Sequence, residues 1–202
     1  MSRGMVLRAA LLALLLALVL RPGWFEPLFA PAAPTGGPVI YERASLLSLS
    51  LSHLGLVALA SGAATLVAVT LAVLVTRPAG AAFRPLSRTI TNIGQTFPPV
   101  AVLALAVPAL GFGAGPTLVA LFLYGLLPIF ENAVTGLSSL PPSAMEAARG
   151  IGLNRRQRLF QVELPLALPV ILTGIRLSVV IALGTATIGS TVAARTLGEV
   201  II

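Results

Sequence analysis

Five long apolar segments separated by short polar stretches limit this chain to a helical fold inside a membrane. They cover residues 5–20, 51–75, 89–110, 116–137 and 166–192. A bilayer core about 30 Å thick needs roughly 20 helical residues to cross it, and four of the five segments reach that length. Only 9% of the residues are charged, whereas soluble domains carry roughly 25%. We therefore expect an all-α integral membrane protein with five visible spans.

The first apolar segment is the shortest and has a second interpretation as a signal peptide. Arg3 and Arg8 form a basic head, and the "APA" at residues 30–32 resembles a cleavage site. That site lies ten residues beyond the apolar run, farther than such sites usually sit. We expect a retained anchor helix followed by a proline-rich external connector, which together make residues 1–50 a separate N-terminal region.

The distribution of arginines predicts an orientation in the membrane. All 13 basic residues are arginines, and positive charge favours the cytoplasmic side. With a cytoplasmic N-terminus, nine arginines fall inside and three outside, and Arg176 lies within the last span. The segment 138–165 is then a cytoplasmic loop. Because the arginines lie between spans, topology explains the net charge of +7, and we expect no nucleic-acid partner.

The composition excludes most catalytic and metal chemistry. The sequence has no cysteine and no aspartate, and it has a single histidine. Disulfides and thiolate metal sites are thereby excluded, and little remains for a metal cluster or a hydrolytic dyad. The sequence also lacks the G-x-x-x-x-G-K-[ST] pattern of a nucleotide-binding loop. We expect a protein that is not an enzyme and has no metal site and no catalytic residues.

The loop 138–165 contains "EAARGIGLNRRQRLFQVELP", an unusually charged stretch in so apolar a chain. Ser143 followed by Glu146 matches a capping box and predicts a short helix that ends near Gly150 and Gly152. Asn154 with Gln157 repeats this signal. It predicts a second short helix, which Pro165 ends before the last span. Helices this short need a surface to pack against.

The first of these short helices has a small, flat face. Ala144, Ala147, Ala148 and Ile151 recur at helical spacing, which suits close docking into a groove of another protein. The flanking arginines could pair with acidic partners or with anionic lipid headgroups. An ordinary positively charged cytoplasmic loop is the alternative interpretation.

The loop resembles the signature of permease subunits of ABC importers, E-A-A, three residues, G, nine residues, I, one residue, L-P. Here the pattern contains Glu146-Ala147-Ala148, then Gly152, then Val162 in place of Ile, then Leu164-Pro165. In that family the first short helix couples the permease to a cytoplasmic ATPase. The resemblance implies a set of ATPase-coupling residues: Ser143, Glu146, Ala147, Ala148, Arg149, Gly150, Gly152, Leu164 and Pro165.

The resemblance also implies an architecture and a set of partners. Residues 51–202 would form a polytopic type I permease domain in the bacterial inner membrane, and family members continue into a further helix, so we expect a truncated C-terminus. The implied partners are an ATP-binding subunit, a second permease copy or paralogue, an extracytoplasmic substrate-binding protein and the lipid bilayer. ATP and Mg would bind to the ATPase subunit, and this chain would hold no cofactor.

Phrases within the spans resemble the osmoprotectant branch, whose importers carry glycine betaine, choline or carnitine. One is "NIGQTFPPVAVLALAVPALGFG" and another is "ELPLALPVILTGIRLSVVIALGTATIGSTVAA". A permease for an amino acid or a sulfonate is the first alternative. A secondary transporter is a weaker one, since no acidic residue for proton or sodium coupling stands at mid-span. Residues 193–198, "AARTLG", depart from the "GAGGLG" of many relatives.

Candidate residues for a translocation path stand in two spans. Asn92, Gln95 and Thr96 precede a proline pair that should bend the third span. Arg176 lies ten residues into the last span, about 15 Å deep. Interhelical hydrogen bonding, and for Arg176 a bond to helix carbonyls or to Glu131, is the alternative role. The sequence has one Trp and two Tyr in no cluster, so tight binding of a quaternary amine is expected in a separate binding protein.

Overall fold

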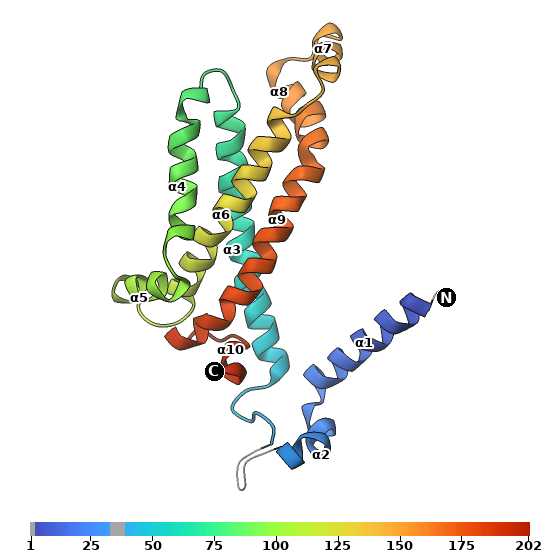
Figure 1. The fold of residues 1–202 in the computed structure, drawn as a ribbon, viewed down its shortest axis with the longest axis vertical. Helices are drawn as coiled ribbons and strands as arrows, with labels where there is room; N and C mark the ends of the chain where they lie inside the picture. Colours follow the sequence, from blue (N-terminus) through green and yellow to red (C-terminus); the bar gives the residue numbers. More distant parts are fainter. Residues whose placement is uncertain (1–2, 33–38) are drawn as a thin grey trace.

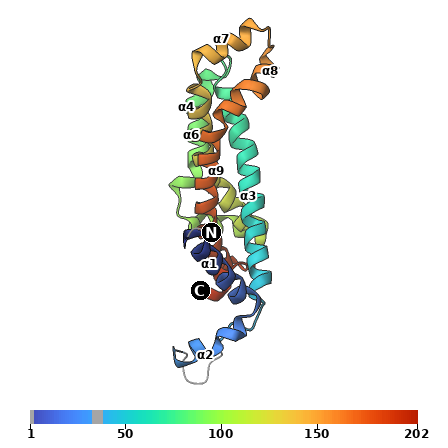
Figure 2. The same cartoon turned by 90° about the vertical axis from the view of Figure 1, so that its right-hand side faces the viewer.

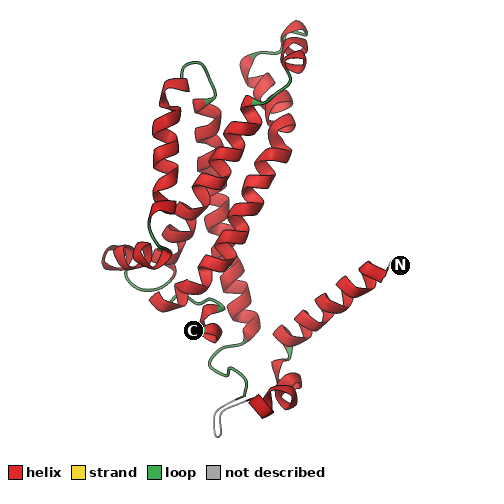
Figure 3. Cartoon of the chain, in the orientation of Figure 1, coloured by secondary structure: helices red, strands yellow, loops and turns green. Residues whose placement is uncertain are grey.

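The computed structural model describes residues 3–32 and 39–202, and within these residues every regular element is a helix (Figure 3). The all-α prediction is confirmed. The α-helices are α1 (Arg3–Leu20), α2 (Glu26–Phe29), α3 (Leu46–Val75), α4 (Arg84–Thr96), α5 (Pro99–Leu110), α6 (Ala114–Ser138), α7 (Pro142–Gly150), α8 (Arg155–Arg158), α9 (Leu164–Ala186) and α10 (Gly198–Ile201).

Helix α6 forms the centre of the bundle. It packs along its length against α3 and α9, and α4 covers a further side (Figure 1). The buried residues between α3, α6 and α9 include many alanines, such as Ala64, Ala68 and Ala133. Small side chains let helix backbones approach closely, and in lipid this close packing replaces the hydrophobic drive between helices.

Two glycines show how closely the helices approach α6. A Cβ atom on Gly174 of α9 would lie 2.6 Å from the carbonyl oxygen of Pro128, and one on Gly94 of α4 would lie 2.4 Å from that of Leu123. Real Cβ atoms do not come this near to backbone, so neither position accepts a side chain without displacing a helix. The packing of α4 and α9 on α6 is therefore fixed by glycine.

The third predicted span is bent, as its proline pair predicts. Among the described residues, three helices are long and apolar enough to cross a membrane, or up to five if each bent pair counts as one span. The chain turns by 95° between α4 and α5, at Phe97, whose φ of −107° and ψ of 145° are extended. A residue before proline is pushed out of the helical region, so Pro98 causes the predicted bend.

The last span also begins differently from the prediction, because Pro165 does not end the helix before it. Helix α8 continues through a π-helical turn at Leu159–Glu163 into α9, and the apolar helical run covers Arg155–Val192. The Leu164 amide bonds to the Leu159 carbonyl in this turn. The wider π turn shifts the hydrogen bonds just ahead of Pro165, so the ring is accommodated within a continuous helix.

The C-terminal segment folds back onto the start of α3. Ser52 donates a hydrogen bond to the Arg195 carbonyl at 2.7 Å, and buried His53 lies 3.1 Å from the Leu183 carbonyl through Nε2. Tyr41 donates to the Glu199 carboxylate at 3.1 Å. Partial burial and this carboxylate raise the pKa of the Tyr41 hydroxyl, so it remains a donor at neutral pH. These contacts fix one end of the bundle.

The turn after α9 contains Ala193 in the left-handed region, with φ of 62° and ψ of 24°. For a residue with a Cβ atom this conformation is unfavourable by about 1–2 kcal/mol of free energy. Ala193 is exposed, so its methyl group contributes little packing in return. This position is the first residue of the "AARTLG" stretch, and a glycine there would be unstrained.

We expect Ala193→Gly to stabilise the protein by about 1 kcal/mol, since relief of the left-handed strain outweighs the added chain entropy of glycine. Thermal unfolding in detergent should show a higher Tm. The matched control is Ala194→Gly, which removes a methyl group that is 1% exposed and should lower Tm. A Tm for Ala193→Gly at or below that of the unaltered chain would contradict the strain.

Candidate functional site: the loop between α6 and α9

Helix α7 starts two residues earlier than the sequence predicts. Pro142 is its first residue and Pro141 its N-cap, with no side-chain hydrogen bond at the cap. The predicted capping box of Ser143 and Glu146 is therefore wrong, and Ser143 lies inside the first turn. Proline has the backbone φ that helix starts need and no amide to satisfy, so Pro142 determines the first turn in place of Ser143.

The end of α7 is a Schellman turn at Gly152. The Gly152 amide bonds to the Arg149 carbonyl at 3.0 Å, and the Leu153 amide bonds to the Ala148 carbonyl at 3.1 Å. Gly152 has a φ of +82°, which glycine adopts without strain. The glycine of the sequence signature thus has a local structural role, which is to reverse the chain after α7.

Helix α8 begins at the predicted capping box. The Gln157 amide donates to Asn154 Oδ1 and the Asn154 amide donates to Gln157 Oε1, each at 2.9 Å. Two of the free amides at the helix start are satisfied in this way. Because α8 joins α9 without a break, this box fixes the start of the whole last span.

The two faces of α7 have different surroundings. Ala148 is only 3% exposed and packs toward the rest of this chain, so the predicted docking face does not include it. Ala144 is half-buried, and Ile151 is 77% exposed. The exposed residues of the implied coupling set are Ser143, Glu146, Ala147, Arg149, Gly150, Gly152 and Pro165. Leu164 instead packs against the core between α3 and α6.

An ion pair that the sequence analysis missed ties this loop to the bundle. Arg77, just after α3, pairs with Glu163 in the π turn, and the Glu163 side chain is 5% exposed against 35% for Arg77. The pair joins residues 86 positions apart, so no local pattern could reveal it. The one sign of this ion pair in the sequence was a lone glutamate, Glu163, directly before the Leu164-Pro165 end of the signature.

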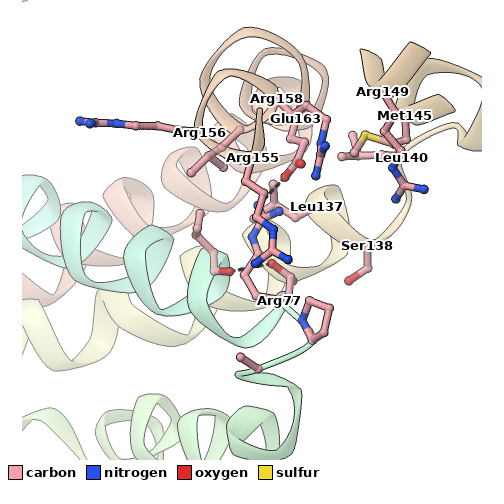
Figure 4. Close-up of a pocket in the computed structure, with 15 residues that line it drawn as sticks. Arg77, Leu137, Ser138, Leu140, Met145, Arg149, Arg155, Arg156, Arg158 and Glu163 are labelled. Atoms are coloured by element: carbon pink, nitrogen blue, oxygen red, sulfur yellow. Dashed lines mark hydrogen bonds and ion pairs between the residues drawn. The ribbon is translucent and has the colours of Figure 1, made fainter. Parts of the chain in front are cut away.

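Beside the ion pair lies a basic pocket of about 950 Å³ between the end of α3, the end of α6, α7 and α8. Figure 4 shows its lining, with Arg77 and Glu163 joined by a dashed line. Its charged residues are Arg77, Arg149, Arg155, Arg156, Arg158 and Glu163. Five of the nine arginines that the sequence places on the cytoplasmic side therefore line one cavity.

The structure does not bring the predicted path residues together within one chain. Asn92, Gln95 and Thr96 lie on α4 and Arg176 on α9, with α6 between these helices (Figure 1). Gln95 donates to the Tyr124 carbonyl and Thr96 to that of Ile93, each at 2.7 Å.

A bond to Glu131, one of the alternative roles of Arg176, is not formed. Glu131 is paired with Arg88 instead, at 2.6 Å. Arg176 is exposed and has no ion pair within residues 3–32 and 39–202. The side chain therefore points away from the bundle of this chain, although it stands in the middle of a span.

Comparison with known proteins identifies the family. Residues 64–202 match the family described as "Binding-protein-dependent transport system inner membrane component". The chain belongs to this family. It is 46% identical over 160 residues to the osmoprotectant import permease protein OsmY of Salmonella typhimurium, covering 79% of this chain and 68% of the relative. It is 39% identical over 166 residues to the choline transport system permease protein OpuBB of Bacillus subtilis, covering 82% and 72%.

Solved structures confirm the fold of this permease. A chain of the inward-facing MetNI methionine ABC transporter superimposes with a TM-score of 0.64 at 23% identity, covering 76% of this chain and 77% of that one. The predicted ABC importer permease fold is thus confirmed. The permease is a multi-pass inner-membrane transport component.

The Schellman turn predicts opposite effects for two neighbouring glycines of this permease. A Cβ atom meets nothing within 4 Å at Gly150 or at Gly152, so packing does not contribute at either. We expect Gly152→Ala to destabilise the end of α7 by about 1–2 kcal/mol through its positive φ. We expect Gly150→Ala, inside the helix, to stabilise it by up to about 1 kcal/mol. Amide hydrogen exchange across α7 should become faster in the first and slower in the second, and the same direction in both would contradict the turn.

The buried ion pair predicts a stability loss on neutralising Glu163. Glu163→Gln leaves Arg77 without its partner, and we expect a loss of about 2 kcal/mol, because Arg77 keeps some contact with solvent. The control is Glu146→Gln, the same change at an exposed position of the same loop, which should have almost no effect. Thermal unfolding in detergent distinguishes them, and an equal Tm for the two variants would refute the role of the pair.

Proposed function

We propose that this permease is the membrane subunit of an ATP-driven importer for an osmoprotectant, namely glycine betaine, choline, carnitine or a similar quaternary amine. The similarity to OsmY over four-fifths of the chain is the observation that supports this most. A second relative, the glycine betaine/carnitine/choline transport system permease protein OpuCB of Bacillus subtilis, is 37% identical over 172 residues. The names of these relatives agree on one solute class.

The ATPase subunit docks on α7 in this proposal, and ATP and Mg bind to that subunit. Figures 1 and 2 both place α7 at the tip of the bundle, opposite the end that carries α10. The exposed residues Glu146 and Ala147 of α7, with Ile151 just after the helix, form a small surface that suits close docking. The buried Ala148 acts on the other side and holds α7 to its own chain.

A second permease copy or a paralogue completes the translocation path. The exposed polar residues Asn92, Gln95 and Thr96 of α4 and the exposed Arg176 of α9 are costly against lipid. We place them at the interface between two permease subunits, where a water-filled path that opens alternately to each side would solvate them. Arg176 would favour the carboxylate end of a betaine.

The tip with α7 is cytoplasmic in this arrangement, and so is the N-terminus. The arginines gathered at that tip support the orientation, while Arg43 and Arg195 lie near the opposite end. Residues 1–50 then form an anchor and an external connector, and residues 51–202 the permease domain.

A substrate-binding protein docks outside and supplies the affinity. Trp24 is 74% exposed and Tyr124 is buried in α6, so these two do not form a cage. Tyr41 lines a cavity of only about 270 Å³ with Phe25 and Phe29. These aromatic residues do not enclose a cation in the middle of the bundle, which supports recognition by a separate protein.

Uptake of labelled glycine betaine and choline into proteoliposomes tests the proposal. The vesicles hold the full-length permease, its ATPase and its binding protein. Ala147→Trp places a bulky ring on the docking side of α7, and we expect ATP-dependent uptake to fall on the order of tenfold, since one misplaced contact of this kind costs about 1.4 kcal/mol or more. Ala82→Trp, at an exposed position of the turn before α4, should leave uptake unchanged.

The outcomes test docking through α7 and the solute class separately. Normal uptake in Ala147→Trp would refute docking through α7. ATP-dependent uptake of an amino acid or a sulfonate in place of betaine would retain the coupling and overturn the solute class.

A further inference from the structure

The basic pocket beside α8 has far more positive than negative charge. Five arginines and one glutamate line its 950 Å³, which leaves a formal charge of +4. The glutamate is Glu163, and Arg77 already neutralises it. The Arg156 side chain extends away from the other labelled residues (Figure 4), and the guanidinium groups of Arg149, Arg155 and Arg158 have no acidic partner among the described residues. Like charges this close repel one another, so an anion bound among them would lower the energy of the loop.

Arg158 supplies a second and independent sign of a missing anion. Its Nε atom is shielded from solvent and has no hydrogen-bond partner in the described part of the chain. Its Nη1 atom donates a long bond of 3.3 Å to the Leu153 carbonyl. A buried donor without an acceptor costs about 1–3 kcal/mol. The lining of the pocket thus provides a donor for an acceptor that this chain does not supply.

The position of the pocket along the helix indicates the source of that acceptor. Within two turns of α8, on the same continuous helix, Phe160 is 59% exposed and Leu166 is 47% exposed. Apolar side chains exposed on a spanning helix face the lipid tails, and an aromatic residue at their edge is typical of the membrane interface. The arginines of α8 therefore lie at the level of the lipid headgroups.

We propose that this pocket binds the phosphate group of an anionic lipid headgroup. The planar guanidinium fork matches phosphate oxygens in pairs, and basic pockets between spanning helices bind acidic headgroups. The cavity is much larger than an inorganic phosphate and has room for a headgroup with its glycerol backbone. A lipid bound here contacts both the end of α3 and the loop that contains α7, and so holds the loop against the bundle whichever solute is transported.

Two adjacent arginines make a matched test. In Figure 4 the Arg155 side chain runs into the pocket toward the end of α3, whereas that of Arg156 extends away from the other labelled residues. Native mass spectrometry of the full-length permease measures bound phosphatidylglycerol against phosphatidylcholine with the same acyl chains. We expect Arg155→Gln to weaken phosphatidylglycerol binding on the order of tenfold, the loss of one charge-assisted contact. Arg156→Gln removes the same charge and should bind as the unaltered chain does.

Further arms distinguish the sources of the anion. Arg155→Lys retains the charge without the fork and should give an intermediate loss. An excess of inorganic phosphate should leave phosphatidylglycerol bound, and displacement would assign the site to a free anion. Equal binding in Arg155→Gln and Arg156→Gln would overturn the proposal. So would a loss of ATPase co-purification in Arg155→Gln with lipid binding unchanged, because the pocket would then hold an acidic segment of that protein.

Discussion

Close backbone packing on α6 is the constraint on which the rest of the structure depends. In a bilayer, lipid tails are as apolar as the side chains, so helices associate by fit and by buried hydrogen bonds. Gly174 and Gly94 bring α9 and α4 within contact of the α6 backbone, and alanines line the contact with α3. Because α6 and α9 are fixed against each other, the loop between them leaves the bundle at a defined place, and α7 has a defined position at its tip.

Two kinds of interaction fix the loop: contacts between residues close together in the sequence and contacts between distant residues. Only the first kind is visible in the sequence. The capping box at Asn154 and the chain reversal at Gly152 involve residues within a few positions, so spacing alone predicts them. The pair of Arg77 with Glu163 and the burial of Ala148 depend on how α3, α6 and α9 meet, which spacing does not encode. The errors at Ser143 and Pro165 have a local cause: Pro142 starts α7 in place of a serine cap, and a π turn accommodates Pro165.

In the proposed docking of an ATPase subunit, the two sides of α7 explain how so short a helix would transmit force. An isolated helix of this length does not persist in water, yet α7 has a proline start, a Schellman end and a buried alanine that together hold its backbone. A docking partner that pushes on the exposed side therefore meets a helix attached to α8 and, through the continuous turn at Leu159–Glu163, to α9. Movement of α7 would displace the whole last span rather than bend a loop.

The outer surface of this chain shows which of its sides lipid cannot cover. Most exposed residues of α3 and α9 are leucine or valine, as a lipid-facing surface requires. Helix α4 breaks this pattern with exposed Asn92, Gln95 and Thr96, and the 95° bend after it leaves carbonyls without their usual helical donors. One of these, on Phe97, accepts the Tyr124 hydroxyl, but the side chains of α4 and Arg176 remain uncovered. Irregular backbone and charge at membrane depth persist only beside protein or water, so the polar sides of α4 and α9 are the surfaces that the proposed second subunit would cover.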